Sequence, residues 1–276
     1  MKTVKHLLLM ACTLLLAISC GQSKTPKYLV LYYSQTGTTQ TVAEAFQKCL
    51  GADIEQIVPV DPYSGSYQET ISRGQQELSS KEFPKIQPLK SDVRAYDVIF
   101  LGFPVWFGTY ANPIATLLDE VDFSGKKIVP FCTFGSGGLD ACVKNIQAKL
   151  PDAEVLPGYG VRAARIAAAP GEIERFLKEG GFIPGETVKL DPFPEAHPAS
   201  EAEAALFDAA VGDYPMIHAK ATAVASRPVP GGTEYLFTAA DLPREGAPAM
   251  PAPPAEFKVY VTALEGQAPA FTQVVR

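Results

Sequence analysis

The fold is decided by residues 28–39, which read Tyr-Leu-Val-Leu-Tyr-Tyr-Ser-Gln-Thr-Gly-Thr-Thr. The first six residues are apolar or aromatic and predict a short buried strand over Tyr28–Tyr33. After the polar run, apolar side chains recur every three or four residues, which predicts a helix over Thr39–Leu50. The sequence therefore indicates a strand that leads through a short loop into the N-terminus of a helix.

The loop itself has the composition of a phosphate cradle. Unpaired backbone N–H groups and the dipole at a helix N-terminus favour an anion. Hydroxyl side chains can donate to phosphate oxygens, and Gly37 lets the backbone approach closely. The loop holds no lysine, whereas nucleoside triphosphate loops end in Gly-Lys-Ser/Thr. We therefore expect a single terminal phosphate, bound by neutral donors of Ser34, Thr36, Gly37, Thr38 and Thr39, with Gln35 as a further ligand-binding residue of the loop.

Length and charge bound the function classes. The chain has 276 residues, 47% hydrophobic and 20% charged, enough for one full core and a small second domain. Its 24 Lys and Arg residues against 30 Asp and Glu residues give a net charge of −6. Because nucleic acids need a basic face that neutralises phosphates, we expect no nucleic-acid partner.

The first residues have the pattern of an export signal, which we assign to residues 1–19. Two lysines precede an unbroken apolar run over Leu7–Ile18. Cys20 follows Ala-Ile-Ser and resembles the lipobox cysteine of bacterial lipoproteins, which carries the lipid after cleavage. Alanine stands where that motif usually has leucine, and cleavage elsewhere with Cys20 lost or unmodified is the alternative. We expect an exported lipoprotein of the bacterial cell envelope, in the periplasm or on the outer surface, with residues 20–26 as the tether from the lipid anchor on Cys20.

Three further cysteines follow the leader: Cys49, Cys132 and Cys142. An odd number permits one bridge at most, and their spacing is not that of a metal site, so we expect no metal. Cys49 and Cys132 fall on predicted apolar faces, which favours buried, inert thiols.

Residues 27–182 alternate strand-like and helix-like segments, the pattern of a parallel sheet covered on both faces. The predicted strands are Tyr28–Tyr33, Asp53–Val58, Asp97–Phe103, Lys127–Thr133 and Glu154–Val161. The predicted helices are Thr39–Leu50, Tyr67–Leu78, Asn112–Glu120, Leu139–Leu150 and Gly171–Gly180. The fold class is therefore α/β, with a doubly wound five-stranded sheet.

A second, smaller domain is expected over residues 200–276. Proline and glycine concentrate in residues 183–199, which predicts a linker. A short helix, Glu201–Val211, then precedes two hairpin-like pairs of strands. Those strands are predicted over Ala221–Ser226, Thr233–Ala239, Phe257–Leu264 and Phe271–Val275. This domain is α+β, with a helix on an antiparallel sheet.

Ligands of doubly wound sheets bind outside the carboxyl ends of the strands, where three loops of this chain meet. The second loop, Gly102–Tyr110, carries Trp106, the only tryptophan. A large aromatic on an exposed loop suggests a flat ring stacked on it, although Trp106 could instead fold back over the sheet as part of the core. The third loop, Thr133–Gly138, is rich in glycine.

These motifs together resemble the flavodoxin family: Ser-x-Thr-Gly-x-Thr after the first strand, Gly-x-Pro-x-Trp after the third, and a glycine-rich turn after the fourth. The resemblance covers roughly residues 27–180. It implies strand order 2-1-3-4-5 and bound FMN, with the phosphate on residues 34–39 and the ring on Trp106. The remaining contacts it implies come from Pro104, Val105, Phe107, Gly108, Thr133, Phe134, Gly135, Ser136, Gly137 and Gly138.

One departure from the family pattern concerns the second face of the ring. Many flavodoxins carry a second aromatic, usually tyrosine, in the third loop. Here that loop holds Phe134 followed by small residues. The second face then meets Phe134, Tyr110 or solvent.

The resemblance implies an electron-transfer protein, whose redox partner protein or quinone-like acceptor the sequence does not identify. An FMN-dependent NAD(P)H or quinone-type reductase is the alternative, although the chain lacks the Gly-x-Gly-x-x-Gly turn of an internal nicotinamide site. A flavodoxin-like shell that has lost its ligand is a further alternative. The C-terminal domain resembles cystatin-like folds, which raises a binding or docking module as another class of function. Protease inhibition is not expected, because Arg227-Pro228-Val229-Pro230-Gly231 stands where cystatins have Gln-x-Val-x-Gly.

Overall fold

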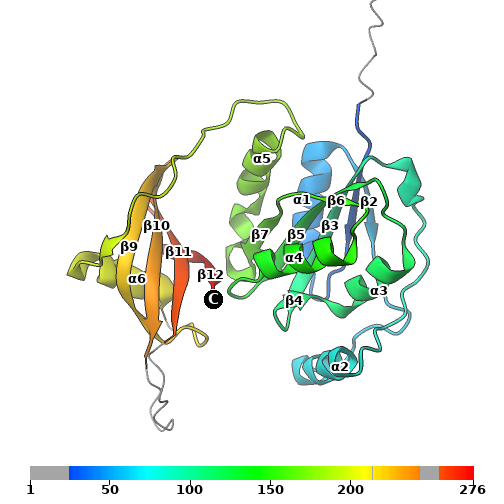
Figure 1. Ribbon diagram of the computed structural model, residues 1–276, viewed down its shortest axis with the longest axis horizontal. Helices are drawn as coiled ribbons and strands as arrows, with labels where there is room; N and C mark the ends of the chain where they lie inside the picture. The colour runs from blue at the N-terminus through cyan, green and yellow to red at the C-terminus, as the bar shows by residue number, and fades with distance from the viewer. Residues whose placement is uncertain (1–24, 213, 243–254) are drawn as a thin grey trace, which may run out of the picture.

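The structure, a computed structural model, describes residues 25–212, 214–242 and 255–276. The proposed signal segment 1–19 and Cys20 lie outside the described residues. Figure 1 shows two bodies side by side, a larger α/β body and a smaller β-rich one, joined by an arching connection after α5.

The larger body is built on a parallel sheet in the predicted order, β2-β1-β3-β5, with β6 and β7 both beside β5. Its strands are β1 (Tyr28–Tyr32), β2 (Asp53–Gln56), β3 (Val98–Trp106), β5 (Lys127–Phe134), β6 (Glu154–Val155) and β7 (Tyr159–Arg162). The expected doubly wound α/β fold is thus confirmed, and its register brings the ends of β1, β3 and β5 to one edge.

Most strands of this sheet differ from the predicted bounds by one or two residues at an end, and two differ further. The fifth predicted strand is split into β6 and β7, because Pro157 has no N–H for a ladder and interrupts it. The third runs three residues further than predicted, to Trp106, because β4 (Thr109–Tyr110) folds back and pairs with its end.

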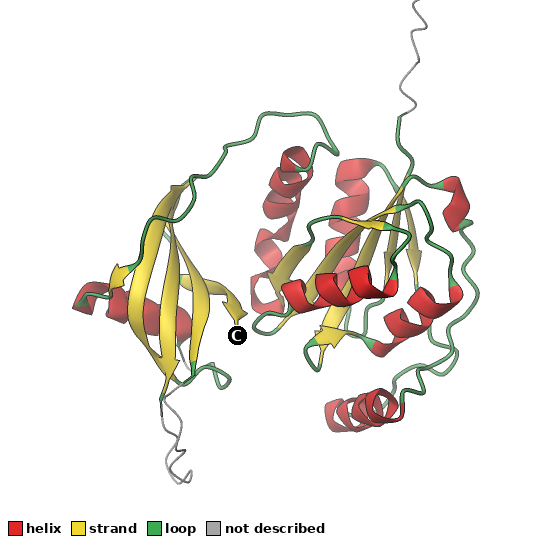
Figure 2. Cartoon of the chain, in the orientation of Figure 1, coloured by secondary structure: helices red, strands yellow, loops and turns green. Residues whose placement is uncertain are grey.

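Helices cover both faces of this sheet (Figures 1 and 2). On one face lie α1 (Thr38–Leu50) and α5 (Ala169–Glu179), and on the other lie α3 (Asn112–Glu120) and α4 (Leu139–Lys149). Two short 3₁₀ turns, η1 (Val93–Ala95) and η2 (Ala163–Ala168), join elements at the sheet ends.

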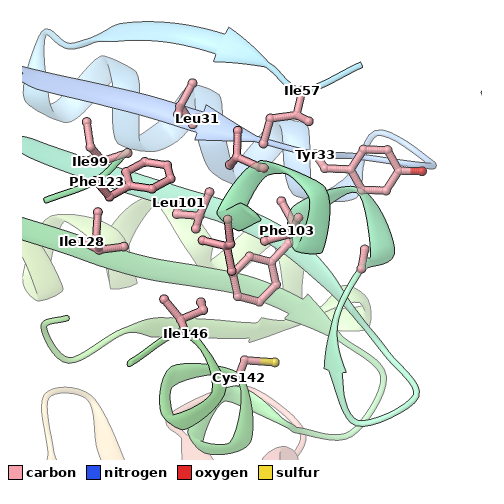
Figure 3. Close-up of a cluster of buried hydrophobic side chains, with 14 of the residues drawn as sticks. Leu31, Tyr33, Ile57, Ile99, Leu101, Phe103, Phe123, Ile128, Cys142 and Ile146 are labelled. Atoms are coloured by element: carbon pink, nitrogen blue, oxygen red, sulfur yellow. The ribbon is translucent and has the colours of Figure 1, made fainter. Parts of the chain in front are cut away.

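Each face has its own apolar core. Beneath α1 and α5, the fully buried Phe46 contacts Phe100 and Phe131 of the sheet at ring-centroid distances of 5.3 and 4.7 Å. Figure 3 shows the opposite core, where Leu101 and Phe103 of β3 gather with side chains of α4. A sheet buried on both faces explains why its strands read as continuous apolar runs.

The smaller body is an antiparallel sheet in the order β12-β11-β10-β9-β8. Its strands are β8 (His197–Pro198), β9 (Ala219–Val229), β10 (Gly232–Asp241), β11 (Glu256–Leu264) and β12 (Ala270–Val275). The helix α6 (Glu201–Val211) packs on it through the buried Phe207 and begins at a capping box on Ser200. This confirms a helix on an antiparallel sheet.

Local differences from the prediction have physical causes here too. Strands β9 and β10 are longer than predicted, because the turn between them needs only Pro230 and Gly231, the latter at φ 78°. The predicted linker 183–199 is not wholly irregular, since its end pairs with β9 as β8.

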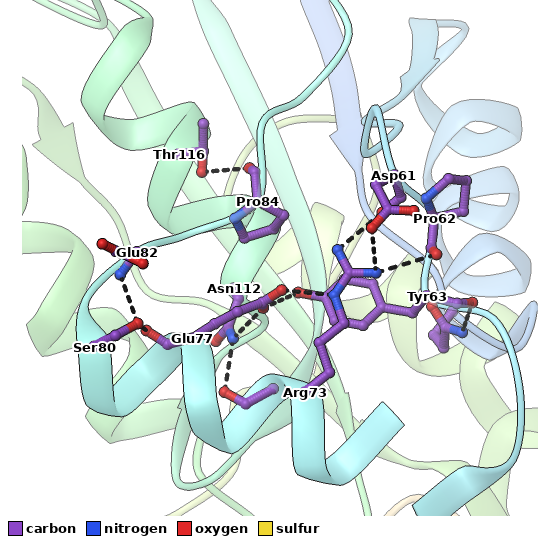
Figure 4. A network of polar contacts seen from close by, with 12 residues as sticks. Asp61, Pro62, Tyr63, Arg73, Glu77, Ser80, Glu82, Pro84, Asn112 and Thr116 are labelled. Atoms are coloured by element: carbon purple, nitrogen blue, oxygen red, sulfur yellow. Dashed lines mark hydrogen bonds and ion pairs between the residues drawn. The ribbon is translucent and has the colours of Figure 1, made fainter. Parts of the chain in front are cut away.

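The remaining helix, α2 (Tyr67–Ser80), lies at the edge of the larger body rather than over the sheet (Figure 1). Only Gly74 of this helix is buried. A polar network holds the helix, centred on the Glu77 carboxylate (Figure 4). Glu77 accepts hydrogen bonds from Arg73 Nε at 2.8 Å, from Asn112 Nδ2 at 2.8 Å and from the Tyr63 hydroxyl.

Arg73 extends the network to the segment before α2. Its guanidinium donates to the carbonyls of Asp61 and Pro62 and lies 4.2 Å from the centroid of the Tyr63 ring. The side chain of Glu77 is only 13% exposed, so its charge depends on these donors. The network therefore fixes α2 against Tyr63, whose ring in turn contacts Trp106.

The three cysteines of the described chain are free, with Cys132 and Cys142 buried and Cys49 half-buried. Burial raises the pKa of the Cys142 thiol to about 12 and that of Cys132 far above its ordinary value. Within residues 25–212, 214–242 and 255–276, no three His, Cys, Asp or Glu side chains gather as a metal ion would require. Nor is any helix of this portion long and apolar enough to cross a bilayer.

Replacing Glu77 with glutamine tests the α2 network. The amide keeps one acceptor oxygen but presents an NH₂ group to donors, so we expect unfolding in urea to require about 2 kcal/mol less free energy. Emission from Trp106 should shift to longer wavelength as Tyr63 loosens. Glu82→Gln, at an exposed position just beyond the same helix, is the matched control. Equal stability of both variants would show that the network does not hold α2.

Candidate cofactor-binding site

The first loop of the site is shaped by its glycine. Gly37 caps α1 with φ 88°, in the left-handed region that L side chains rarely adopt. The Gly37 N–H donates a hydrogen bond to the Ser34 hydroxyl at 3.1 Å. None of the described side chains caps α1, so the first backbone N–H groups of the helix face outward at the loop. The local geometry is that of an anion site.

The hydroxyls of this loop have different surroundings. Thr36 and Thr38 are at least partly accessible, and their oxygens lie 3.4 Å apart. Thr39 is buried and its hydroxyl lies 2.8 Å from that of Thr133, at the end of β5. Thr36 and Thr38 are therefore free to face a ligand, while Thr39 joins the first loop to the third.

Gln35 is held in place by two tyrosines. The Tyr33 hydroxyl donates to its side-chain oxygen at 2.5 Å, and its amide donates to the carbonyl of Tyr63 at 2.9 Å. Burial raises the pKa values of both tyrosines well above the ordinary value, so the hydroxyls stay protonated donors. The first loop is thereby tied to the segment that precedes α2.

The second loop is a tight hairpin rather than the exposed loop expected from the sequence. Phe107 and Gly108, at φ 51° and 80°, form a two-residue turn between β3 and β4. Trp106 is the last residue of β3 and is half-buried. Its ring meets Tyr33 and Tyr63 edge to face, at centroid distances of 5.8 and 5.0 Å. Trp106 thus packs on the core and also lines the cavity described next.

A cavity of about 540 Å³ opens between these loops and α2, within the range of small-molecule sites. Of the described residues that line it, none is charged at neutral pH. The lining residues are Gln35, Thr36, Thr38, Thr39, Gly65, Tyr67, Thr70, Ile71, Pro104, Val105, Trp106, Phe107, Thr133, Phe134, Gly135 and Ala163. The site offers hydroxyl and amide groups at one end and aromatic surface at the other, without a carboxylate, lysine or histidine for acid–base chemistry.

Eleven of the seventeen positions predicted from the sequence line this cavity. They are Gln35, Thr36, Thr38, Thr39, Pro104, Val105, Trp106, Phe107, Thr133, Phe134 and Gly135. The other six do not: Ser34, Gly37, Gly108, Ser136, Gly137 and Gly138. Ser34 and Gly37 instead shape the first loop, and Ser136 accepts a hydrogen bond from Val274 N at 2.7 Å, away from the cavity.

Sequence reasoning missed the wall that α2 contributes. Tyr67, Thr70 and Ile71 come from its first turns, and Gly65 precedes it. The one usable signal was Tyr67, an aromatic at the start of a polar helix, which is 82% exposed. Tyr110, expected near the second ring face, does not line the cavity, whereas Tyr67, Phe107 and Phe134 do. A ring stacked on Trp106 would meet its second aromatic among those three.

Comparison with known proteins agrees with this architecture. The model of the family described as Flavodoxin matches residues 27–168. "Flavodoxin 1" of Escherichia coli (strain K12) is 29% identical over 106 residues, which cover 37% of this chain and 46% of the relative. A protein named "NAD(P)H dehydrogenase (quinone)" from Gluconacetobacter diazotrophicus is 32% identical over 99 residues, 34% of this chain and 46% of the relative. The chain thus spans about half the length of these curated relatives.

Among solved structures, a putative flavoprotein from Bacteroides eggerthii is 30% identical and covers 54% of this chain and 98% of its own, with a TM-score of 0.46. A flavoprotein from Lactobacillus acidophilus, solved in complex with FMN, is 27% identical and covers 49% and 93%, with a TM-score of 0.45. The family match covers the whole sheet as far as β7 and every loop of the cavity. The chain belongs to the flavodoxin family, which supports FMN as its cofactor.

Proposed function

We propose that this chain binds FMN and carries electrons, held by a lipid on Cys20 at the bacterial cell envelope, outside the cytoplasm. The observation that carries the redox part is one uncharged cavity that joins an uncapped helix N-terminus to an aromatic wall. FMN has the matching shape, with a phosphate at one end and a flat ring at the other. When bound, it supplies reversible electron transfer, and the protein supplies binding and orientation.

The residues of the cavity fit this cofactor in chemistry as well as in shape. Thr36 and Thr38 offer hydroxyl donors beside the first N–H groups of α1, which suits a phosphate. Trp106 is held by Tyr33 and Tyr63, so its ring is preorganised and costs little entropy when a ligand stacks on it.

The electrostatics favour a low reduction potential. Among the described residues, the cavity lining has no cation to stabilise an anionic reduced ring, and the chain as a whole carries a net charge of −6. Negative charge placed in such surroundings is disfavoured, and more so where water is excluded. A low-potential carrier is the function that these surroundings support best.

The reductase alternative draws support from the relative named as a dehydrogenase. It also draws support from the exposed side of the cavity at Tyr67, where a second substrate has room to approach. Against it, no lining residue in the described part of the chain could bind the phosphates of a nicotinamide nucleotide through charge. We therefore place electron carriage first. Anchoring at Cys20 draws support from the lysines and apolar run that precede it.

Binding of FMN and of riboflavin by the purified protein tests the cofactor and the phosphate cradle together. We expect a yellow protein, quenching of Trp106 fluorescence on titration, and tighter binding of FMN than of riboflavin. Thr38→Val should weaken FMN binding roughly tenfold or more, since hydrogen bonds to charged groups contribute about 1.5–3 kcal/mol, and should leave riboflavin binding unchanged. Thr222→Val, which loses a hydroxyl in the smaller body, is the control. A wild type that binds neither flavin would refute the cofactor assignment.

Turnover distinguishes the carrier from the reductase. With FMN loaded, we expect NADH or NADPH and a soluble quinone to give no steady turnover unless a separate reductase is added, because the cavity holds no charged group for a nucleotide. Chemical reduction followed by rapid oxidation with cytochrome c should succeed. Sustained turnover by the protein alone would reverse the order of the two functions.

Replacing Cys20 with serine tests the anchor. Since serine cannot take the thioether-linked lipid, the full-length variant should lose metabolic labelling with a radioactive fatty acid and leave the membrane fraction. Cys49→Ser, in the larger body, should keep both. Fatty-acid labelling of the Cys20 variant equal to that of the wild type would show that the lipid is not on this cysteine.

A further inference from the structure

The edge of the smaller sheet meets the third loop of the cavity. Strand β12 is an edge strand, whose outward backbone groups need a cover. The Val274 N–H donates to the carbonyl of Ser136 at 2.7 Å. At Gly137 a Cβ would lie only 2.2 Å from the Val274 carbonyl oxygen, so this approach requires glycine. In Figure 1, β12 is the strand of the smaller body that faces the larger one.

A buried arginine completes this contact. Arg162 ends β7, is 8% exposed, and donates from Nε to the Gly135 carbonyl at 2.9 Å and from Nη1 to the Phe271 carbonyl at 3.0 Å. Its guanidinium carbon lies 3.3 Å from the centroid of the Phe271 ring and 5.2 Å from that of Tyr214. One cation therefore links the third loop to β12, with carbonyls and aromatic rings as its partners.

The same loop forms part of the cavity wall. Thr133, Phe134 and Gly135 line the cavity, and the Thr133 hydroxyl is bonded to Thr39 of the phosphate loop. Gly135, Gly137 and Gly138 would leave the backbone of an isolated loop with many accessible conformations. The Gly135 carbonyl, at the boundary between wall and interface, is the group that Arg162 holds.

We propose that the smaller domain positions the cofactor site: through Arg162 and β12 it holds residues 135–138 in the conformation that the bound ring needs. Arg162 is a positioning residue in this scheme, since it acts through the Gly135 carbonyl and does not line the cavity. Linkage then requires that domain docking and ring binding stabilise one another. This inference rests on the proposed binding of FMN.

Two variants of the full chain open the contact from different sides. Gly137→Ala places a methyl group against Val274 without changing any residue of the cavity lining, and its backbone is not in the left-handed region. The matched control is Gly171→Ala, where the added Cβ meets nothing within 4 Å. Arg162→Met removes the donors, and Arg162→Lys, which keeps a cation and a donor, should recover part of what methionine loses.

The test is to measure two quantities for each variant. One is the FMN dissociation constant, and the other is hydrogen–deuterium exchange of residues 133–138 and 270–275 in the ligand-free protein. Gly137→Ala and Arg162→Met should raise the dissociation constant about tenfold, within the 5- to 150-fold span of typical couplings, and speed exchange in both segments. Gly171→Ala should do neither, and FMN should slow exchange in β12 of the wild type. If one variant does not fold, the other and Arg162→Lys still decide.

The outcomes separate this inference from the function on which it rests. A wild type that binds no FMN would overturn the proposed function. A wild type that binds FMN, beside variants that bind it equally well, would overturn the positioning role alone, whether or not their loop exchange is faster. Unchanged exchange of residues 133–138 in both variants would overturn it as well, because the loop would then be held by something else.

Discussion

The site depends on one buried hydrogen bond, between the hydroxyls of Thr39 and Thr133. Both side chains are almost fully shielded from water, so each hydroxyl needs the other as its partner. They are 94 residues apart in the chain and stand at the ends of different strand–helix units. The bond joins the phosphate loop to the third loop, and both threonines line the cavity. It is possible because parallel strands bring their carboxyl ends to one edge.

The α2 wall of the cavity is held in place by charged side chains. A network around the Glu77 carboxylate holds α2 against Tyr63 and Asn112, and the buried Gly74 lets the Phe107 ring of the β3–β4 hairpin approach the helix. The charges of this network lie behind Tyr63 and Trp106, outside the cavity itself. Charged side chains thus fix the α2 wall from outside the cavity. The surface offered to a ligand stays uncharged, which suits the flat ring of the proposed FMN.

The sequence was sufficient to predict those parts of the fold that depend on residues close together in the chain. The continuous apolar strands, the amphipathic helices and the loop at Gly37 predicted the doubly wound sheet and its three ligand loops. The resemblance to the flavodoxin family implied most of the residues that line the cavity. The α2 wall could not be predicted, because only Gly74 of the helix is buried and its place is fixed by polar contacts with partners such as Tyr63 and Asn112 on other elements. Ser136 and Gly137 have the composition of a ligand loop, yet their neighbours come from β12. The role of Arg162 could not be predicted, because a single sequence does not distinguish an arginine buried between two domains from one on the surface.

The contact between the two bodies gives each of them a partner that it lacks alone: β12 gains cover for its edge, and the glycine-rich loop gains a fixed neighbour. An antiparallel sheet of five strands leaves β12 as an exposed edge, where free N–H groups invite unwanted pairing. A glycine-rich loop at a ligand site has the opposite problem, since it must lose many conformations before it can bind. When Ser136 covers Val274, the edge gains a partner and the loop gains a fixed backbone. In the positioning role that we propose, the smaller domain needs no ligand of its own, because β12 together with Arg162 holds the loop that lines the cavity.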